Sequence, residues 1–393
     1  MGMIDPTILK AFKELATEDP TEGDDDIERT WINFRLGYGD PTLVAPVKTR
    51  DKTRTGICGS RRAPFMDKLV EQIPKELCHF NKRLTGVEKL ASGLMNLVFE
   101  DGTNSFANAV VGADGIRSSL RQLAFGGNSH LDYLSFTRTV CYRALVPMHI
   151  AVDAMGKELA TTSEMYIGPG GHILTYPIDR GAMMNVVACT QQDSWDSEAW
   201  AIKNVPFERV QGTFSQWGPH VQNLLKAMKD QSVDLWSLWD SADKPLSTYC
   251  KDHLVLIGDA AHASLPHQGA GAGQAIEDAL VLAEVLSSLD VKRPADLPAA
   301  FQAYDAMRRP RSQKVVRTSR EVGDVYRLEG PDGDDLESIG IDLRTRLNWV
   351  WYEDQDLQVL RAKELCSMLL AQSREMERMK VATAKQPRWG WVY

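Results

Sequence analysis

The stretch from residue 253 to residue 286 constrains the fold more than any other part of the chain. It reads HLVLIGDAAHASLPHQGAGAGQAIEDALVLAEVL. Residues 253–257 predict a short apolar strand, and residues 275–286 predict a helix. Three glycines lie at positions 269 to 273, where they destabilise the chain unless another group approaches the backbone closely. The sequence therefore predicts a strand–loop–helix unit of an α/β protein with a ligand at the loop. The alternative is a glycine-rich connection without a ligand.

The same stretch places a carboxylate, Asp259, directly after the predicted strand. In open α/β sheets, ligands bind at the carboxyl ends of the strands. Asp259 could accept hydrogen bonds from the hydroxyls of a sugar or polyol. The positive end of the following helix would face the same crevice, which suits a cofactor that becomes anionic when it is reduced.

A second strand–turn–helix unit is expected at residues 109–118, which read AVVGADGIRS. Its glycines allow a ligand to approach the backbone, and a helix that opens at Arg117 and Ser118 offers free N–H groups to an anion. The guanidinium of Arg117 can bind a phosphate. The alternative is a strand–helix turn in which Asp114 caps the helix, and the sequence does not decide between the two.

Composition excludes several classes of protein. Hydrophobic residues make up 43% and charged residues 25% of the 393 residues, as in soluble globular proteins, and the net charge of −8 argues against nucleic-acid binding. No apolar run reaches the ~18 residues of a membrane helix, and the N-terminus does not resemble a secretory signal. The six cysteines form no C-x-x-C pair, which predicts buried thiols and a cytoplasmic protein. We expect no metal site, because His262 and His267 lack a set of carboxylates around them.

The remaining patterns predict helices and strands along the chain. Helices are expected at 4–16, 62–74, 207–229 and 353–381, and at 297–327 with an interruption near Pro310. A hairpin is expected from strands 94–99 and 106–111, and an antiparallel sheet from 139–148, 164–167, 172–178 and 183–189. The basic residues of helix 297–327, Arg308 and Arg311 among them, are expected to lie mostly on a solvated face. The acidic residues 18–28 predict an exposed loop, and residues 385–393 an extended lid or surface strip.

The two glycine-rich motifs closely resemble those of the flavoprotein aromatic hydroxylases, the FAD-dependent single-component monooxygenases typified by salicylate hydroxylase. GADGIRS at 112–118 and GDAAHASLPHQGAGAGQAIEDA at 258–279 carry the resemblance, which extends to about residue 325. It implies an α/β fold in which an FAD-binding, Rossmann-like domain encloses an antiparallel-sheet substrate domain. By this resemblance, residues 1–130 and 246–325 would form the FAD-binding domain and residues 131–245 the substrate domain. Residues 326–393 would form a C-terminal helical extension.

The resemblance also implies roles for single residues. Asp259 would bind the ribityl chain of the flavin, and Pro266 would lie near the flavin carbon that takes up oxygen. Ala272 with its neighbours Gly269 and Gly271 would line the isoalloxazine. Arg62 would contact the flavin, and Asp114 would lie near the pyrophosphate and the NAD(P)H path.

Two residues of the predicted sheet would hold the substrate. In dearomatising phenol hydroxylases, an arginine and a tyrosine at positions that match Arg143 and Tyr176 hold the substrate phenolate. A guanidinium favours a phenolate or carboxylate, and an ionised phenol is the better nucleophile towards oxygen. The alternative is that Tyr176 is ordinary sheet core and Arg143 a surface charge.

The function that the resemblance implies is NAD(P)H- and O₂-dependent hydroxylation of a phenol or aromatic acid through a flavin hydroperoxide, in aromatic catabolism or polyketide secondary metabolism. A homodimer is possible. Two alternatives stay open: a non-catalytic remnant that binds an aromatic ligand or a partner chain, and a decarboxylating hydroxylase.

One expected motif is missing from the sequence. The family begins with a βαβ unit that carries G-x-G-x-x-G and binds the ADP half of FAD. The first glycines here have other spacings; they are Gly2, Gly23, Gly37 and Gly39. A shortened version of the gene, a degenerate copy or a partner chain would each explain this, and we favour the first. We therefore expect the chain to retain FAD poorly.

Overall fold

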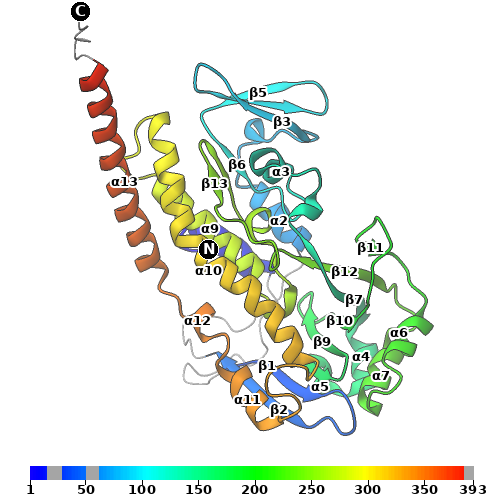
Figure 1. Cartoon of the computed structure of the whole chain (residues 1–393). Coiled ribbons are helices and arrows are strands. Elements are labelled where there is room, and N and C mark those ends of the chain that lie inside the picture. The colour runs from blue at the N-terminus through cyan, green and yellow to red at the C-terminus, as the bar shows by residue number, and fades with distance from the viewer. Residues whose placement is uncertain (16–28, 50–61, 385–393) are drawn as a thin grey trace, which may run out of the picture. The chain divides into compact units, whose positions relative to one another are not determined.

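The computed structural model describes residues 1–15, 29–49 and 62–384 (Figure 1). The expected acidic loop and the expected C-terminal strip lie outside these residues. The chain forms two compact units. The first consists of residues 1–79, 135–240 and 318–352, and the second of residues 80–134, 241–317 and 353–393. Residues 1–79, expected in the FAD-binding part, thus group with the unit that holds residues 135–240.

An eight-stranded sheet forms the centre of the first unit. Its order is β11-β12-β7-β10-β9-β8-β1-β2. All neighbouring strands are antiparallel except β1 and β8, which are parallel. The strands are β1 (Arg29–Leu36), β2 (Leu43–Thr49), β7 (Ser135–Pro147), β8 (Glu164–Gly168), β9 (Gly171–Ile178), β10 (Met183–Gln191), β11 (Ala201–Ile202) and β12 (Asp234–Asp240). The four strands expected from the sequence are β7 to β10, and their antiparallel pairing is confirmed.

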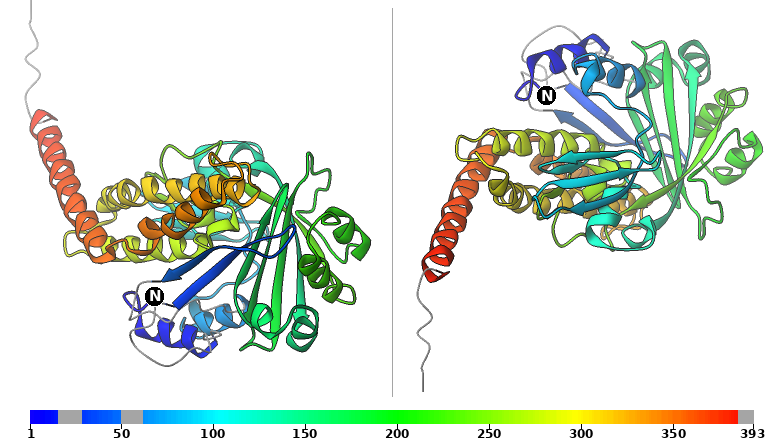
Figure 2. Two further views of the ribbon diagram at one scale, coloured as in Figure 1. Left: turned by 90° about the horizontal axis from the view of Figure 1, so that it is seen from below. Right: turned by 90° about the horizontal axis from the view of Figure 1, so that it is seen from above.

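Helices cover one face of this sheet (Figure 2). They are α4 (Met148–Met155), α5 (Lys157–Thr161), α6 (Phe207–Thr213) and α7 (Pro219–Ala227). Val146 and Val186 from the sheet pack there with Leu224 from α7, and all three are fully buried. On the other face, strands β1, β2 and β8 pack against the end of α10 (Leu297–Tyr326) and against α11 (Leu336–Thr345). The unit also contains α1 (Pro6–Leu15), α2 (Arg62–Val70), η1 (Lys75–Leu77) and α12 (Asn348–Trp351).

The second unit contains two small sheets and several helices. One sheet has the order β13-β14-β6 with β14 and β6 parallel, and the other is the antiparallel sheet β3-β4-β5. The strands are β3 (Leu84–Lys89), β4 (Met95–Phe99), β5 (Asn104–Ala107), β6 (Val110–Gly112), β13 (Cys250–Lys251) and β14 (Leu254–Leu256). The helices are α3 (Ser119–Phe125), α8 (Asp259–His262), α9 (Gly271–Leu286), the first part of α10, α13 (Gln355–Ala384) and the short η2 (His130–Asp132), η3 (Pro266–Gln268) and η4 (Pro294–Asp296).

A hydrophobic core joins the helices of the second unit to its strands. Val255 of β14, Val281 of α9, Tyr304 of α10 and Cys366 of α13 are fully buried in this core. Helix α13 is in contact with α9. The packing fixes α9, whose N-terminus follows the glycine-rich loop, against strand β14.

Several expected elements differ from those in the structure. The helix expected at 207–229 is two helices, because Pro219 starts a new helix and disfavours helical geometry at the residue before it. The strand expected at 106–111 is β5 and β6, which belong to different sheets. The helix expected at 62–74 ends at Val70. The interruption expected near Pro310 is absent, and α10 continues through it.

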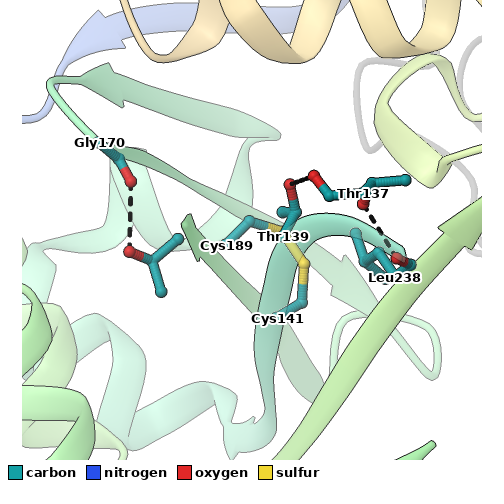
Figure 3. The surroundings of a disulfide bond; sticks show 7 residues. Thr137, Thr139, Cys141, Gly170, Cys189 and Leu238 are labelled. Carbon is teal, nitrogen blue, oxygen red and sulfur yellow. Dashed lines mark hydrogen bonds between the residues drawn. A yellow bond between two sulfur atoms is a disulfide. The ribbon is translucent and has the colours of Figure 1, made fainter. Parts of the chain in front are cut away.

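A disulfide crosses the first unit's sheet between Cys141 of β7 and Cys189 of β10 (Figure 3). The register places these residues directly opposite each other, and both are buried. Opposed residues of antiparallel strands are close enough for such a bond. The expectation of buried free thiols is therefore wrong for these two cysteines, since it took no account of strand register. Among the described residues, no helix has the length and apolarity that a membrane span requires.

Candidate functional site

Two parallel strands bring the glycine-rich motifs to one edge of the second unit's sheet. Leu256 of β14 pairs with Gly112 of β6, and Asp114 and Asp259 follow shortly after these strand ends. A Cβ at Gly112 would lie 2.7 Å from side-chain atoms of Leu120 and Leu256, so a larger residue there would displace these two leucine side chains. The structure thus places both motifs at the carboxyl edge of the parallel pair, as the sequence predicts.

Asp114 organises the start of helix α3. Its carboxylate accepts a hydrogen bond from the Ser118 hydroxyl and another from the Leu120 N–H at 3.0 Å. The Ser118 hydroxyl in turn accepts from the Arg121 N–H, which makes Ser118 the N-cap of α3. Ser118 is thus the N-cap itself, and Asp114 supports it and binds a free N–H of the first turn. Since Asp114 itself is exposed, this role leaves room for a ligand contact.

Arg121 joins the two motifs, a role that the sequence analysis missed. Its guanidinium donates to the carbonyl oxygen of Ala260 at 2.9 Å and to that of Asp259 at 3.3 Å. It also donates to the carbonyl oxygen of Ile116 at 2.6 Å. The residue is 2% exposed, and burial lowers the pKa of its guanidinium. The signal in the sequence was an arginine inside the first turn of the helix that follows GADGIRS.

The start of helix α9 offers backbone N–H groups beside open space. The helix begins at Gly271, four residues earlier than expected, and none of the side chains that the structure describes caps it. Within the described parts of the chain, a Cβ at Gly269 or Gly273 would meet nothing within 4 Å, so there is space beside the first turn. Pro266, Gly269 and Ala272 are exposed, and Gly271 is half-buried. Helix N–H groups beside open space fit a planar cofactor with polar edges.

A buried network lies directly beneath these loops. The Asp278 carboxylate of α9 accepts hydrogen bonds from the Gly258 N–H at 2.9 Å, from His262 Nε2 at 2.6 Å and from Arg308 Nε at 2.8 Å. Asp278 and Arg308 are fully buried. Burial opposes ionisation of Asp278, but the charges and hydrogen bonds of His262 and Arg308 outweigh it and lower its pKa. His262, weighed above as a metal ligand, is therefore paired with a carboxylate.

Further contacts complete the network around Arg308. Its guanidinium also binds the side-chain oxygens of Gln274 at 2.8 Å and Gln358 at 2.7 Å, and that of Glu277. Arg311 is nearly buried as well and contacts Glu277 at 2.8 Å. The expectation of a solvated basic face is wrong for Arg308 and Arg311, because α9 and α13 cover them. Among the described residues, no group of three or more histidine, cysteine or acidic side chains gathers as a metal site would.

Arg143 and Tyr176 share one face of the first unit's sheet. Arg143 lies on β7 opposite Val187, and Tyr176 lies on β9 opposite Asn185. Strand β10 separates their two strands, so they are not on adjacent strands. Because residues 185 and 187 of β10 point to the same face, Arg143 and Tyr176 do too. Burial raises the pKa of the Tyr176 hydroxyl, and the nearby charge of Arg143 partly opposes this rise.

Arg62 is the remaining predicted cofactor residue. It is exposed and begins helix α2. It belongs to the first unit, whereas Asp114, Asp259 and the residues from Pro266 to Ala272 belong to the second.

Comparison with known proteins agrees with the motifs. A family model described as an FAD binding domain matches residues 79–319. The FAD-dependent monooxygenase pigN of Monascus ruber is 38% identical over 93% of this chain and 84% of its own length. The 6-methylsalicylate 1-monooxygenase atA of Aspergillus terreus is 36% identical and covers 100% of this chain and 85% of its own length.

Solved structures agree as well. A salicylate hydroxylase substrate complex superimposes with a TM-score of 0.82 at 31% identity, over 92% of this chain and 88% of that one. The FAD-binding fold predicted from the motifs is thereby confirmed, and with it the aromatic hydroxylase family. The chain belongs to the FAD-dependent monooxygenases of the salicylate hydroxylase-like family.

Proposed function

We propose that the chain hydroxylates a phenol or phenolic acid with NAD(P)H and O₂. The observation that carries this substrate class is the placement of Arg143 and Tyr176 on one face of the sheet, close enough for the arginine charge to act on the tyrosine hydroxyl. The balanced reaction converts an aromatic C–H to C–OH, oxidises NAD(P)H to NAD(P)⁺ and reduces the second oxygen atom to water. Relatives named for salicylate and 6-methylsalicylate support a ring of this kind.

The residues of the chain would divide the work between cofactor and substrate. When bound, FAD supplies the electron transfer from NAD(P)H and the activation of O₂. Asp259 would hold the polyol of the cofactor, and the N–H groups at the start of α9 would favour its anionic reduced form. Arg143 would stabilise the substrate as a phenolate, which is more electron-rich than the phenol. The Tyr176 hydroxyl, kept protonated by burial, would donate a hydrogen bond to the same oxygen.

The experiment supplies FAD in excess and measures NADH and NADPH oxidation with salicylate, 6-methylsalicylate and 2-hydroxyacetophenone. Mass spectrometry then identifies the product. A gain of one oxygen atom supports hydroxylation, and loss of CO₂ from the acids identifies the decarboxylating variant. A chain that binds these ligands but never forms an oxygenated product is the non-catalytic remnant instead.

A further inference from the structure

One buried polar group on the face of the sheet that carries Arg143 and Tyr176 has no partner. Asn185 lies within β10 and is 2% exposed. Its side-chain nitrogen Nδ2 is buried and makes no hydrogen bond in the described part of the chain. An unpaired buried amide costs about 1–3 kcal/mol, so its presence within a packed strand requires an explanation.

The neighbours of Asn185 are the residues proposed above to hold the substrate. On one side the register places Asn185 opposite Tyr176, and on the other opposite Leu145. Arg143 is its diagonal neighbour, since it lies two residues from Leu145 on the same strand. Diagonal neighbours across a sheet are about 7–8 Å apart, which long side chains can span.

On this part of the sheet, aliphatic side chains lie next to hydrogen-bond donors. Leu145, Leu174 and Val187 are half-buried and point to the same face as Asn185. Tyr176 is also half-buried. The unpaired amide is therefore more deeply buried than the side chains next to it on this face. An aromatic ring that packs on the aliphatic residues would direct a substituent between Leu145 and Tyr176.

We propose that Asn185 determines which substrates bind. Its Nδ2 donates a hydrogen bond to the carbonyl or carboxylate oxygen of a ring substituent that is ortho to the phenol hydroxyl. This proposal rests on the proposed function, because it takes Arg143 as the partner of the phenolate. Two neighbouring oxygens on one ring match two neighbouring donors, the guanidinium of Arg143 and the amide of Asn185. A site that holds an unpaired donor rejects ligands that lack the acceptor, because the donor then stays unpaired.

The test compares two neutral phenols of similar shape, 2-hydroxyacetophenone and 2-isopropylphenol, which differ by a carbonyl oxygen in place of a methyl group. Isothermal titration calorimetry measures both affinities with FAD present throughout. The wild-type chain is expected to bind the ketone more tightly. Asn185→Leu is expected to weaken ketone binding by about 10-fold or more and to change 2-isopropylphenol binding by less than about 2-fold.

Thr175→Val is the matched control. Thr175 is fully buried and its hydroxyl also has no hydrogen-bond partner among the described residues, but it lies opposite Val186 on the helix-covered face. The control is expected to keep the preference for the ketone. The thermal unfolding temperature of each variant is expected to equal or exceed that of the wild type, because each variant loses an unpaired buried polar group.

Three results would overturn the assignment of Asn185. They are a wild-type chain with no preference between the probes, a wild-type chain that binds neither, and an Asn185→Leu variant that keeps the preference or weakens both ligands equally. Failure of the proposed function gives a different result: the preference is present and depends on Asn185, but no oxygenated product forms.

Discussion

The imidazole of His262 donates a hydrogen bond of 2.6 Å to the buried carboxylate of Asp278. His262 ends the short helix that begins at Asp259, and Asp278 lies on α9. Through this bond the two segments proposed to bind the flavin are held to each other. The Gly258 N–H and Arg308 bind the same carboxylate, which therefore fixes the whole loop region.

Asp278→Asn is expected to lower the free energy of unfolding by about 3–5 kcal/mol, because it leaves Arg308 and His262 buried beside a neutral amide. Affinity for FAD is expected to fall about 10-fold or more, since the Asp259 loop loses its support. Urea unfolding and FAD titration by fluorescence measure the two effects.

Glu284→Gln is the control on the same helix. Glu284 pairs with Lys363 and both side chains are about one-third exposed, so the change is expected to cost less than about 1 kcal/mol. If Asp278→Asn and Glu284→Gln lose equal amounts of unfolding free energy and of FAD affinity, the buried carboxylate has no special role.

The free energy of unfolding is expected to fall at acidic pH, because the carboxylates of the same network become protonated. Burial opposes ionisation of Asp278 and Glu277, but their cationic partners outweigh it and lower both pKa values. Such groups stabilise the fold fully above their unfolded pKa values of about 4, and this contribution is lost as pH falls through the lower folded values. Urea unfolding between pH 7 and pH 3 measures the loss. The dependence is expected to be weaker in Asp278→Asn, and identical profiles for both proteins would contradict this account.

Gly273→Ala is expected to separate folding from cofactor binding. The new Cβ lies on the first turn of α9 in open space, so stability without FAD is expected to rise by about 0.5–1 kcal/mol. FAD affinity is expected to fall, because the methyl group occupies the space proposed for the flavin. Thermal unfolding and FAD titration measure the two effects.

Gly212→Ala in α6 is the matched change, since its Cβ also meets nothing within 4 Å. It is expected to raise stability and leave FAD binding unchanged. If Gly273→Ala binds FAD as tightly as Gly212→Ala, the flavin does not occupy the space beside α9.

The disulfide between Cys141 and Cys189 is expected to contribute about 2–4 kcal/mol, because it closes a loop with a sequence separation of 48 residues. The double variant Cys141→Ser, Cys189→Ser is expected to unfold at lower urea concentration, to the same extent as the reduced wild type. Thiol titration of the unfolded, non-reduced protein should find two thiols fewer than after reduction. Equal thiol counts would show that the bond does not form.

The sequence predicted those parts of the site whose signals are local. Strand β14, the carboxylate Asp259 and the glycines around the start of α9 lie in one continuous segment, so their spacing alone indicates a cofactor loop. The four strands from β7 to β10 were predictable for the same reason, since each shows strand composition along its own length.

Other features depend on contacts between distant residues. Arg308 belongs to a run of basic residues, and its burial follows only from Asp278 and Gln358 on two other helices. The Cys141–Cys189 bond follows from the β7–β10 register. The pairing of β1 with β8 joins residues 33–36 to residues 164–167, and no periodicity within either segment indicates it.

The most direct test of the proposed function is ¹⁸O₂ incorporation with FAD in excess, NAD(P)H and salicylate, 6-methylsalicylate or 2-hydroxyacetophenone. We predict a product from the wild-type chain that carries one ¹⁸O atom, and a fall in product formation of about 100-fold or more for Arg143→Ala, with FAD affinity unchanged. A wild-type chain that oxidises NAD(P)H without forming a labelled product, or an Arg143→Ala variant as active as the wild type, would contradict it.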